Sequence, residues 1–158
     1  MLNEISAEAE ATADFYSALP LGQLLHIAGR QMDEILKQSV ADSGLTPEQV
    51  SVLGAVQRMP GYGQNVYARL LGINDATFGR YATRLSQEKL LRRRRSRNDR
   101  RLVALYPTDK GAALVVNLRK SLKSVNTQLN SLLPQGEAEK MCRMLRDFTV
   151  AYLADPPD

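Results

Sequence analysis

The chain has 158 residues, of which 44% are hydrophobic and 24% charged, so a single domain with a packed core is expected. Its one cysteine, Cys142, excludes an internal disulfide framework and a cysteine-rich zinc site. No run of about eighteen apolar residues is present, and the acidic N-terminus has no signal-like apolar segment, so we expect a cytoplasmic protein with no membrane partner.

The positive charge is concentrated in one segment. The formal net charge is +4, but residues 92–101 alone hold seven arginines against a single acid, Asp99. The rest of the chain is therefore slightly acidic. A basic feature confined to so short a segment predicts a polyanionic partner.

The first segments expected are an arm and a long helix. Residues 1–14 are polar, acidic and rich in alanine, which fits either a frayed arm or an early helix. From Phe15 to Val40 the apolar residues recur at helical spacing and predict an amphipathic helix. Gly44 offers this helix a C-terminal cap. The apolar positions are Leu21, Leu24, Leu25, Ala28, Met32, Ile35 and Leu36.

Two further helices and a recognition-type helix follow. Thr46, Pro47 and Gln49 form a capping box with proline at the first helical position, and MPGYG (residues 59–63) ends that helix. A short helix is expected over residues 65–72. Asn74 or Asp75 then caps a helix that runs to about Leu91.

After Leu91 the period of the pattern changes. Residues 92–95 can be extended, SRND has the composition of a turn, and RRLVALY has the character of a strand, so the segment predicts a β-hairpin ending at Pro107. Leu102, Val103 and Leu105 are expected to anchor this hairpin to the helices. Helices over residues 109–133 and 137–153 complete the chain.

This order predicts a mainly α fold, a winged helix-turn-helix with flanking dimerisation helices, containing about six helices and a two-stranded β-hairpin wing. We expect an N-terminal arm and dimerisation helix over residues 1–44. The DNA-binding lobe would cover residues 45–107, and C-terminal dimerisation helices residues 108–158.

The helix beginning at Asp75 has two distinct sides. Phe78, Ala82 and Leu85 form an apolar stripe, whereas Thr77, Arg80 and Arg84 form a second stripe that can face bases and phosphates. Arg80 is the best candidate for reading a base, because its planar fork fits guanine O6 and N7. Asp75, Ala76 and Gly79 complete the candidate DNA-contacting set. Alternatively, the two arginines belong to a solvated helix face.

Gly79 is expected to lower the stability of this helix. A glycine in a helix interior loses about 1 kcal/mol relative to alanine. Close approach of a partner to the helix backbone would explain why it is tolerated.

Arginines on a protruding hairpin can straddle the backbone of duplex DNA with the tip in the minor groove. Arg97 is the candidate for the tip, and Asp99 can hold Arg100 or Arg101 and so organise the loop. The remaining wing candidates are Arg94 and Arg95. A basic patch for RNA, for an anionic lipid or for a nuclear-import receptor is the alternative. The capped helix that precedes the hairpin favours duplex DNA.

The sequence DRRLVALYPTDKG at Asp99–Gly111 follows helix motifs at Leu45–Leu53, Ala68–Asp75 and Ala76–Leu91. Together these stretches resemble the MarR (multiple antibiotic resistance regulator) family of bacterial repressors. The resemblance implies an obligate dimer that binds a palindromic operator, with Asp99 organising the wing and Arg100 contacting DNA.

The chain departs from the family pattern at three places. Lys89 stands where the family usually has glycine, and Pro107 stands where it usually has leucine. The run of four consecutive arginines, residues 92–95, is also more basic than usual.

The dimer is also expected from the residues themselves. The helices over residues 15–40, 109–133 and 137–153 carry more apolar side chains than a small three-helix unit can cover. A second copy of the chain is the economical way to bury them. The two recognition helices would then lie ~34 Å apart, one turn of the DNA.

A small-molecule effector is a further possibility raised by the resemblance, since MarR-like regulators often bind small aromatic or phenolic acids. His26 and Arg30 are candidates to hold a carboxylate, with Tyr16 or Tyr67 lining the pocket. The alternative is that His26 is an interface histidine without a ligand. Cys142 is either an oxidation sensor or, more in keeping with its apolar helix, a buried inert thiol. Nothing in the sequence predicts catalysis, a metal site or a cofactor.

Overall fold

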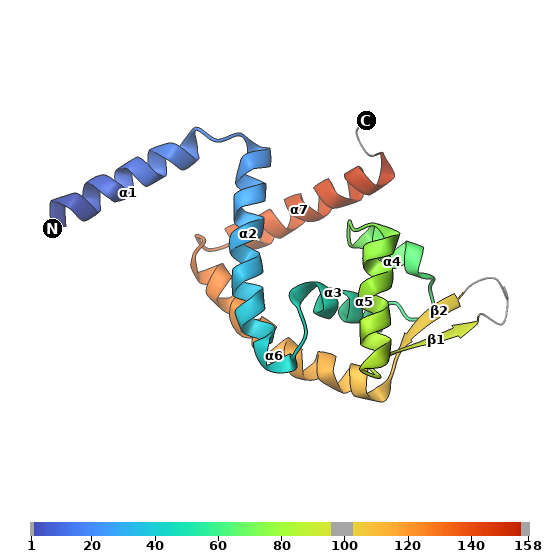
Figure 1. Cartoon of the computed structure of the whole chain (residues 1–158). Helices are drawn as coiled ribbons and strands as arrows, with labels where there is room; N and C mark the ends of the chain where they lie inside the picture. The colour runs from blue at the N-terminus through green and yellow to red at the C-terminus, as the bar shows by residue number, and fades with distance from the viewer. Residues whose placement is uncertain (1, 96–102, 156–158) are drawn as a thin grey trace. The chain divides into compact units, whose positions relative to one another are not determined.

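The structure is a computed structural model that describes residues 2–95 and 103–155, with side chains from Glu10 onward. The chain divides into two compact units, residues 1–36 and 37–158. Figure 1 labels the helices and strands along the chain. Helix α2, Leu21–Val40, passes from the first unit into the second. No helix among the described residues is both long and apolar enough to cross a membrane.

The first unit contains helix α1, Leu2–Ser17, and most of α2. Pro20 separates the two helices, because it lacks the N–H that a continuous helix would need there. Its carbonyl accepts hydrogen bonds from Gln23 and Leu24 N, which begins α2. The expected single helix from Phe15 is therefore wrong at its start: Phe15 belongs to α1, and the long helix begins at Leu21.

The second unit begins with the end of α2. A short 3-10 turn, Ala41–Ser43, follows, and Gly44 ends it in the left-handed conformation, with φ 68°. Helix α3, Pro47–Arg58, starts at a complete capping box. Gln49 N donates to Thr46 Oγ1 at 3.3 Å, and Thr46 N donates to Gln49 Oε1 at 3.0 Å, as expected from the sequence.

The lobe continues with helices α4, Gln64–Leu70, and α5, Asp75–Gln87. Tyr67 and Phe78 stack at its centre with ring centroids 5.8 Å apart, and neither side chain is exposed. The Tyr67 hydroxyl donates to the carbonyl of Met59 and accepts from Tyr62 N. Burial raises the pKa of this phenol. The other core residues are Leu45, Val52, Leu53, Val56, Ala68, Ala82, Leu85, Leu90, Leu91, Leu105 and Val115.

The wing consists of the antiparallel strands β1, Leu91–Arg95, and β2, Val103–Pro107, paired from Leu91 with Pro107 to Arg95 with Val103. Strand β2 also bonds the loop before α4: Leu105 N donates to Tyr62 O, and Gly61 N donates to Leu105 O. Ala104 and Leu105 are consequently both buried. Val103, expected to anchor the hairpin, is instead 44% exposed, and Leu102 lies outside the described residues.

The second unit ends in two long helices, α6, Asp109–Ser131, and α7, Glu137–Ala154. Thr108 caps α6 by accepting from Gly111 N at 3.1 Å. Helix α7 has no buried residue in the single chain. The winged helix-turn-helix predicted from the sequence is confirmed.

Candidate DNA-binding surface

Helix α5 is fixed by its cap and its apolar stripe. The Asn74 side chain accepts a hydrogen bond from Thr77 N at 2.8 Å at the first turn. Phe78, Ala82 and Leu85 are fully buried, as expected from their spacing. Because one side of the helix is held in the core, the opposite side is presented to solvent in a defined orientation.

The exposed side of α5 forms the wall of a shallow hollow of about 460 Å³. Arg80 and Arg84 line it, together with Ala76 and Gly79, which carry little or no side chain. The remaining lining residues are Gln64 from α4, Thr83 and Gln87 from α5, and Arg93 from β1. Basic and amide side chains therefore surround a depression over the helix backbone.

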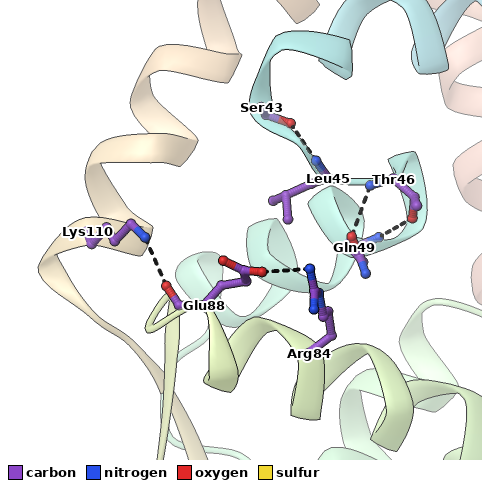
Figure 2. A network of polar contacts seen from close by, with 7 residues as sticks. All are labelled: Ser43, Leu45, Thr46, Gln49, Arg84, Glu88 and Lys110. Atoms are coloured by element: carbon purple, nitrogen blue, oxygen red, sulfur yellow. Dashed lines mark hydrogen bonds and ion pairs between the residues drawn. The ribbon is translucent and has the colours of Figure 1, made fainter.

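Two arginines of α5 already have side-chain partners, one within the helix and one at its C-terminal cap. Arg80 Nη2 donates to Thr77 Oγ1 at 3.2 Å. Arg84 Nη2 lies 2.8 Å from Glu88 Oε1 (Figure 2). The side chains of the two residues are 60% and 40% exposed. An exposed pair of this kind contributes little to stability, so a phosphate or a base can replace Glu88 at small cost.

The arginines of β1 alternate between the two faces of the wing. Directly opposed residues share a face, so Arg93 and Arg95 lie with Leu105 and Val103, whereas Arg92 and Arg94 lie on the other face with Tyr106 and Ala104. Arg93 Nη2 donates to Thr83 Oγ1 of α5 at 3.2 Å. The face of Arg93 is thus the one joined to α5.

Arg93 also lines a second hollow, of about 380 Å³, between the wing and the beginnings of α4 and α5. Its other walls include Asn65, Asp75 and Val103. The side chain of Arg93 therefore connects the surface of α5 with that of the wing. The expected tip residue Arg97 and the other wing candidates Asp99, Arg100 and Arg101 lie outside the described residues.

Four residues of this surface were not among the sequence candidates: Gln64, Thr83, Gln87 and Arg93. Thr83 and Gln87 continue the helical spacing of Ala76 and Arg80, and Arg93 follows from strand alternation, so the sequence carried signals for these three. Gln64 carried none. It reaches the surface because α4 packs against α5, which is a tertiary effect.

The effector candidates fall in different places. His26 and Arg30 line a hollow of about 340 Å³ in the first unit, together with Phe15. Tyr16 packs edge-on against Phe15 with centroids 5.3 Å apart. Tyr67 is a core residue of the second unit rather than a pocket-lining one, because its side chain is fully enclosed.

The sequence favoured a buried thiol at Cys142, but this residue is exposed on α7 in the single chain. Within the described part of the chain, no three His, Cys, Asp or Glu side chains are grouped so as to hold a metal ion.

A capped helix with a buried stripe, a basic outer surface and an arginine-rich two-stranded wing beside it define a winged helix-turn-helix lobe of the DNA-binding type. Comparison with known proteins agrees with this class. The model of the MarR family matches residues 43–102. No curated protein sequence matches the chain.

Three solved structures resemble the chain over most of its length. The transcriptional repressor CouR, bound to a 23-mer DNA duplex, is 32% identical with a TM-score of 0.76, covering 82% of this chain and 92% of that one. A structure of MarR is 25% identical with a TM-score of 0.76, covering 87% and 96%. BpsR of Bordetella bronchiseptica, whose DNA binding is regulated by 6-hydroxynicotinic acid, is 27% identical with a TM-score of 0.75, covering 82% and 93%. The chain belongs to the MarR family of winged-helix transcriptional regulators.

Proposed function

We propose that the chain is a bacterial, cytoplasmic transcriptional repressor, without catalytic activity, that binds a palindromic duplex as a homodimer. The observation that carries this proposal is the outer surface of α5, where Arg80, Arg84 and Arg93 line one hollow together with Gly79. In the proposal, α5 enters the major groove with this surface against the base edges. The wing follows the adjacent phosphates, and its tip reaches the minor groove.

The charges of the surface suit a division of roles. Arg80 lies near the middle of α5 and reads a base, because its guanidinium can leave the Thr77 hydroxyl at the cost of one exposed hydrogen bond. The exposed arginines of β1 contact phosphates and set affinity rather than sequence preference. CouR, a relative at 32% identity, is a repressor seen on a DNA duplex, which supports the same role for this chain.

The experiment is selection of bound duplexes from a random pool with the wild-type protein. A palindromic consensus is expected, with half-sites about one helical turn apart. Binding constants for the selected and a scrambled duplex are then measured for wild type, for Arg80→Ala and for Lys120→Ala. Lys120 is an exposed residue of α6 and serves as a matched control.

Arg80→Ala is expected to lose about 1–3 kcal/mol on the selected duplex, mainly at one base position. Lys120→Ala should bind the selected and the scrambled duplex with the affinities of the wild type. The logarithm of the binding constant should fall linearly with the logarithm of the salt concentration, with a slope of roughly −0.9 per phosphate contacted. Equal losses of Arg80→Ala on selected and scrambled DNA would contradict the base-reading role. If single-stranded RNA or anionic vesicles competed for the protein better than duplex DNA did, the alternative of an RNA- or lipid-binding protein would be favoured.

We further propose that a small aromatic acid releases the protein from DNA by binding at His26 and Arg30. The two cationic or cation-forming side chains lie one helical turn apart, beside the ring of Phe15, in one hollow. BpsR, a relative at 27% identity, responds to 6-hydroxynicotinic acid, a ligand of this kind. Release of DNA by such acids from wild type, but not from Arg30→Ala, tests the proposal.

A further inference from the structure

Gln64 of α4 borders both hollows of the candidate DNA-binding surface. It lines the hollow over α5 together with Gly79 and Arg80, and it also lines the hollow between the wing and the beginnings of α4 and α5. Of the described residues that line these hollows, Gln64 and Arg93 are the two that belong to both. A side chain that is not part of the recognition helix is thus placed at the centre of the surface.

The position of the Gln64 amide is set by α5. A Cβ built at Gly79 would lie 3.7 Å from Gln64 Oε1 and 4.0 Å from Gln64 Nε2, so both polar atoms of the amide lie beside this point of the helix. Gln64 is partly buried, which restricts its side chain. Within the described part of the chain, however, the amide forms no hydrogen bond. The fold therefore positions the amide and leaves its donors and acceptor available.

The chemistry of this amide suits a base edge better than a phosphate. A side-chain amide carries both a donor group and an acceptor, whereas phosphate oxygens only accept hydrogen bonds. In the major groove adenine offers the complementary pair, an N6 donor and an N7 acceptor, and glutamine can bind both at once. Arg84 and Arg93, which line the same hollow, already supply positive charge for phosphates.

We infer that Gln64 determines part of the sequence preference of this protein, by binding an adenine in each half-site near the base that Arg80 reads. The inference rests on the proposed function, because it requires α5 to lie in the major groove. Gln64 and Arg80 line one hollow from two different helices. Base reading is therefore divided between α4 and α5.

The test uses the full chain in selections from a random duplex pool, with wild type and four variants. Gln64→Ala removes the amide, whereas Gln64→Met removes it but keeps an unbranched side chain of similar length beside Gly79. Gln64→Glu replaces the donor group by an acceptor. Gln128→Ala is the control, because Gln128 is an exposed glutamine of α6 that lines neither hollow.

Two further measurements separate loss of fold from loss of base preference. Thermal unfolding is recorded for every variant. Each variant is also titrated with the duplex selected by wild type, with versions of it changed at one base pair, and with a scrambled duplex.

Wild type is expected to prefer adenine at one position of each half-site by about tenfold or more. Gln64→Ala and Gln64→Met should lose this preference and keep those at the other positions, and Gln128→Ala should keep all of them. Gln64→Glu should transfer the preference at that position from adenine to cytosine, because the N4 amino group of cytosine donates to a carboxylate.

The outcomes distinguish this inference from the proposed function. If wild type selects no duplex, the proposed function itself fails. If wild type selects a palindrome and the folded Gln64 variants keep every base preference, only the inference is overturned. Equal losses of Gln64→Ala on the selected and the scrambled duplex would make Gln64 a phosphate contact, which also overturns it.

Discussion

Among the glycines whose surroundings are described, Gly111 has the least space for a side chain. It lies in the first turn of α6, directly against the backbone that follows α5. A Cβ at this position would lie 2.1 Å from the carbonyl oxygen of Leu90 and 3.3 Å from Leu53 Cδ1. Because the obstacle is backbone rather than a flexible side chain, the segment that joins α5 to β1 and the start of α6 would have to separate.

We expect Gly111→Ala to lower the free energy of unfolding by about 2–4 kcal/mol, as overpacking against a rigid neighbour does. Gly54→Ala in α3 is the matched control, since a Cβ there meets no atom within 4 Å. That control should raise stability by up to about 1 kcal/mol, the gain of alanine over glycine in a helix. Urea unfolding of both variants measures the difference. Equal effects would show that the contact with Leu90 relaxes freely.

At Lys89 the backbone conformation, rather than the space for a side chain, is unfavourable. Lys89 is the one non-glycine residue with positive φ in the described chain, at 58°, and it forms the turn between α5 and β1. The backbone is kept in place there because the Thr108 hydroxyl donates to the carbonyl of Lys89 at 2.6 Å. The position at which the family pattern has glycine is thus a left-handed position in this chain too.

Lys89→Gly is therefore expected to raise the free energy of unfolding by about 0.5–1 kcal/mol, because a side chain in the left-handed region costs about 1–2 kcal/mol and part of the gain is lost to the flexibility of glycine. The measurement is again urea unfolding. Lys89→Ala separates the backbone effect from the charge, since it removes the ammonium and keeps the strain. If alanine stabilises as much as glycine, the charge and not φ is responsible.

Gly79 differs from both, because nothing in the free protein requires it. A Cβ at this position meets Gln64 Oε1 at 3.7 Å, an ordinary contact, and the backbone is helical. We expect Gly79→Ala to raise stability by up to about 1 kcal/mol and to weaken duplex binding, because the added methyl narrows the hollow over α5. Unfolding and DNA titration on the same samples test both effects. Unchanged DNA affinity would show that no partner approaches the backbone at this residue.

At the scale of elements, much of the lobe followed from the sequence because its signals are local. The capping box at Thr46, the cap at Asn74 and the inward stripe of α5 depend only on residues three or four apart, and the structure has them as expected. The misplaced start of α2 came from reading helical spacing across Pro20. Apolar periodicity continued through that residue although the backbone hydrogen bonds cannot.

The errors within the lobe came from long-range packing. Tyrosine is a common ligand contact, and Tyr67 was therefore a candidate. It is a core residue instead, because it packs among the buried residues of α3, α4 and α5. Val103, expected to anchor the hairpin, is exposed, and Ala104 beside it is buried, because β2 pairs with residues 61–63 as well as with β1. Gln64 joins the candidate surface only through the packing of α4 on α5. None of these partners lies near in sequence, so periodicity alone could not reveal them.

Strand alternation gives the wing a prediction of its own. Arg93 and Arg94 are adjacent, identical and exposed, but only Arg93 lies on the face joined to α5 by its bond to Thr83. Arg93→Ala is expected to weaken duplex binding by about 1 kcal/mol or more, and Arg94→Ala by less. Each variant is the control for the other, because both remove the same charge from the same strand. Equal losses in DNA titrations would mean that only the total charge of the wing matters.

At the scale of the whole molecule, α7 poses the main question. Its large apolar side chains are exposed in the single chain: Met141, Met144, Leu145, Phe148, Val150 and Tyr152. Five of the six recur at helical spacing, and Phe148 and Tyr152 stack with centroids 6.4 Å apart. An exposed stripe of this extent is unfavourable for a monomer in water and is the kind of surface that a second copy covers.

Phe148→Glu is accordingly expected to shift the protein toward monomer, because pairing two copies would bury two unpaired carboxylates in an apolar interface. Arg146→Glu, on a neighbouring exposed position of α7, is the control for introducing an acid. Light scattering across a dilution series measures the association. Far-UV circular dichroism checks that the helices persist.

The same variant links assembly to DNA binding. A dimer gains affinity from two recognition helices held one turn of DNA apart, so a monomer should bind the palindrome little better than one half-site. Wild type should therefore prefer the intact palindrome over a single half-site by at least about a hundredfold, and Phe148→Glu should lose most of that preference while keeping its half-site affinity. A monomeric variant that retains the full preference would show that the two lobes assemble on DNA without α7.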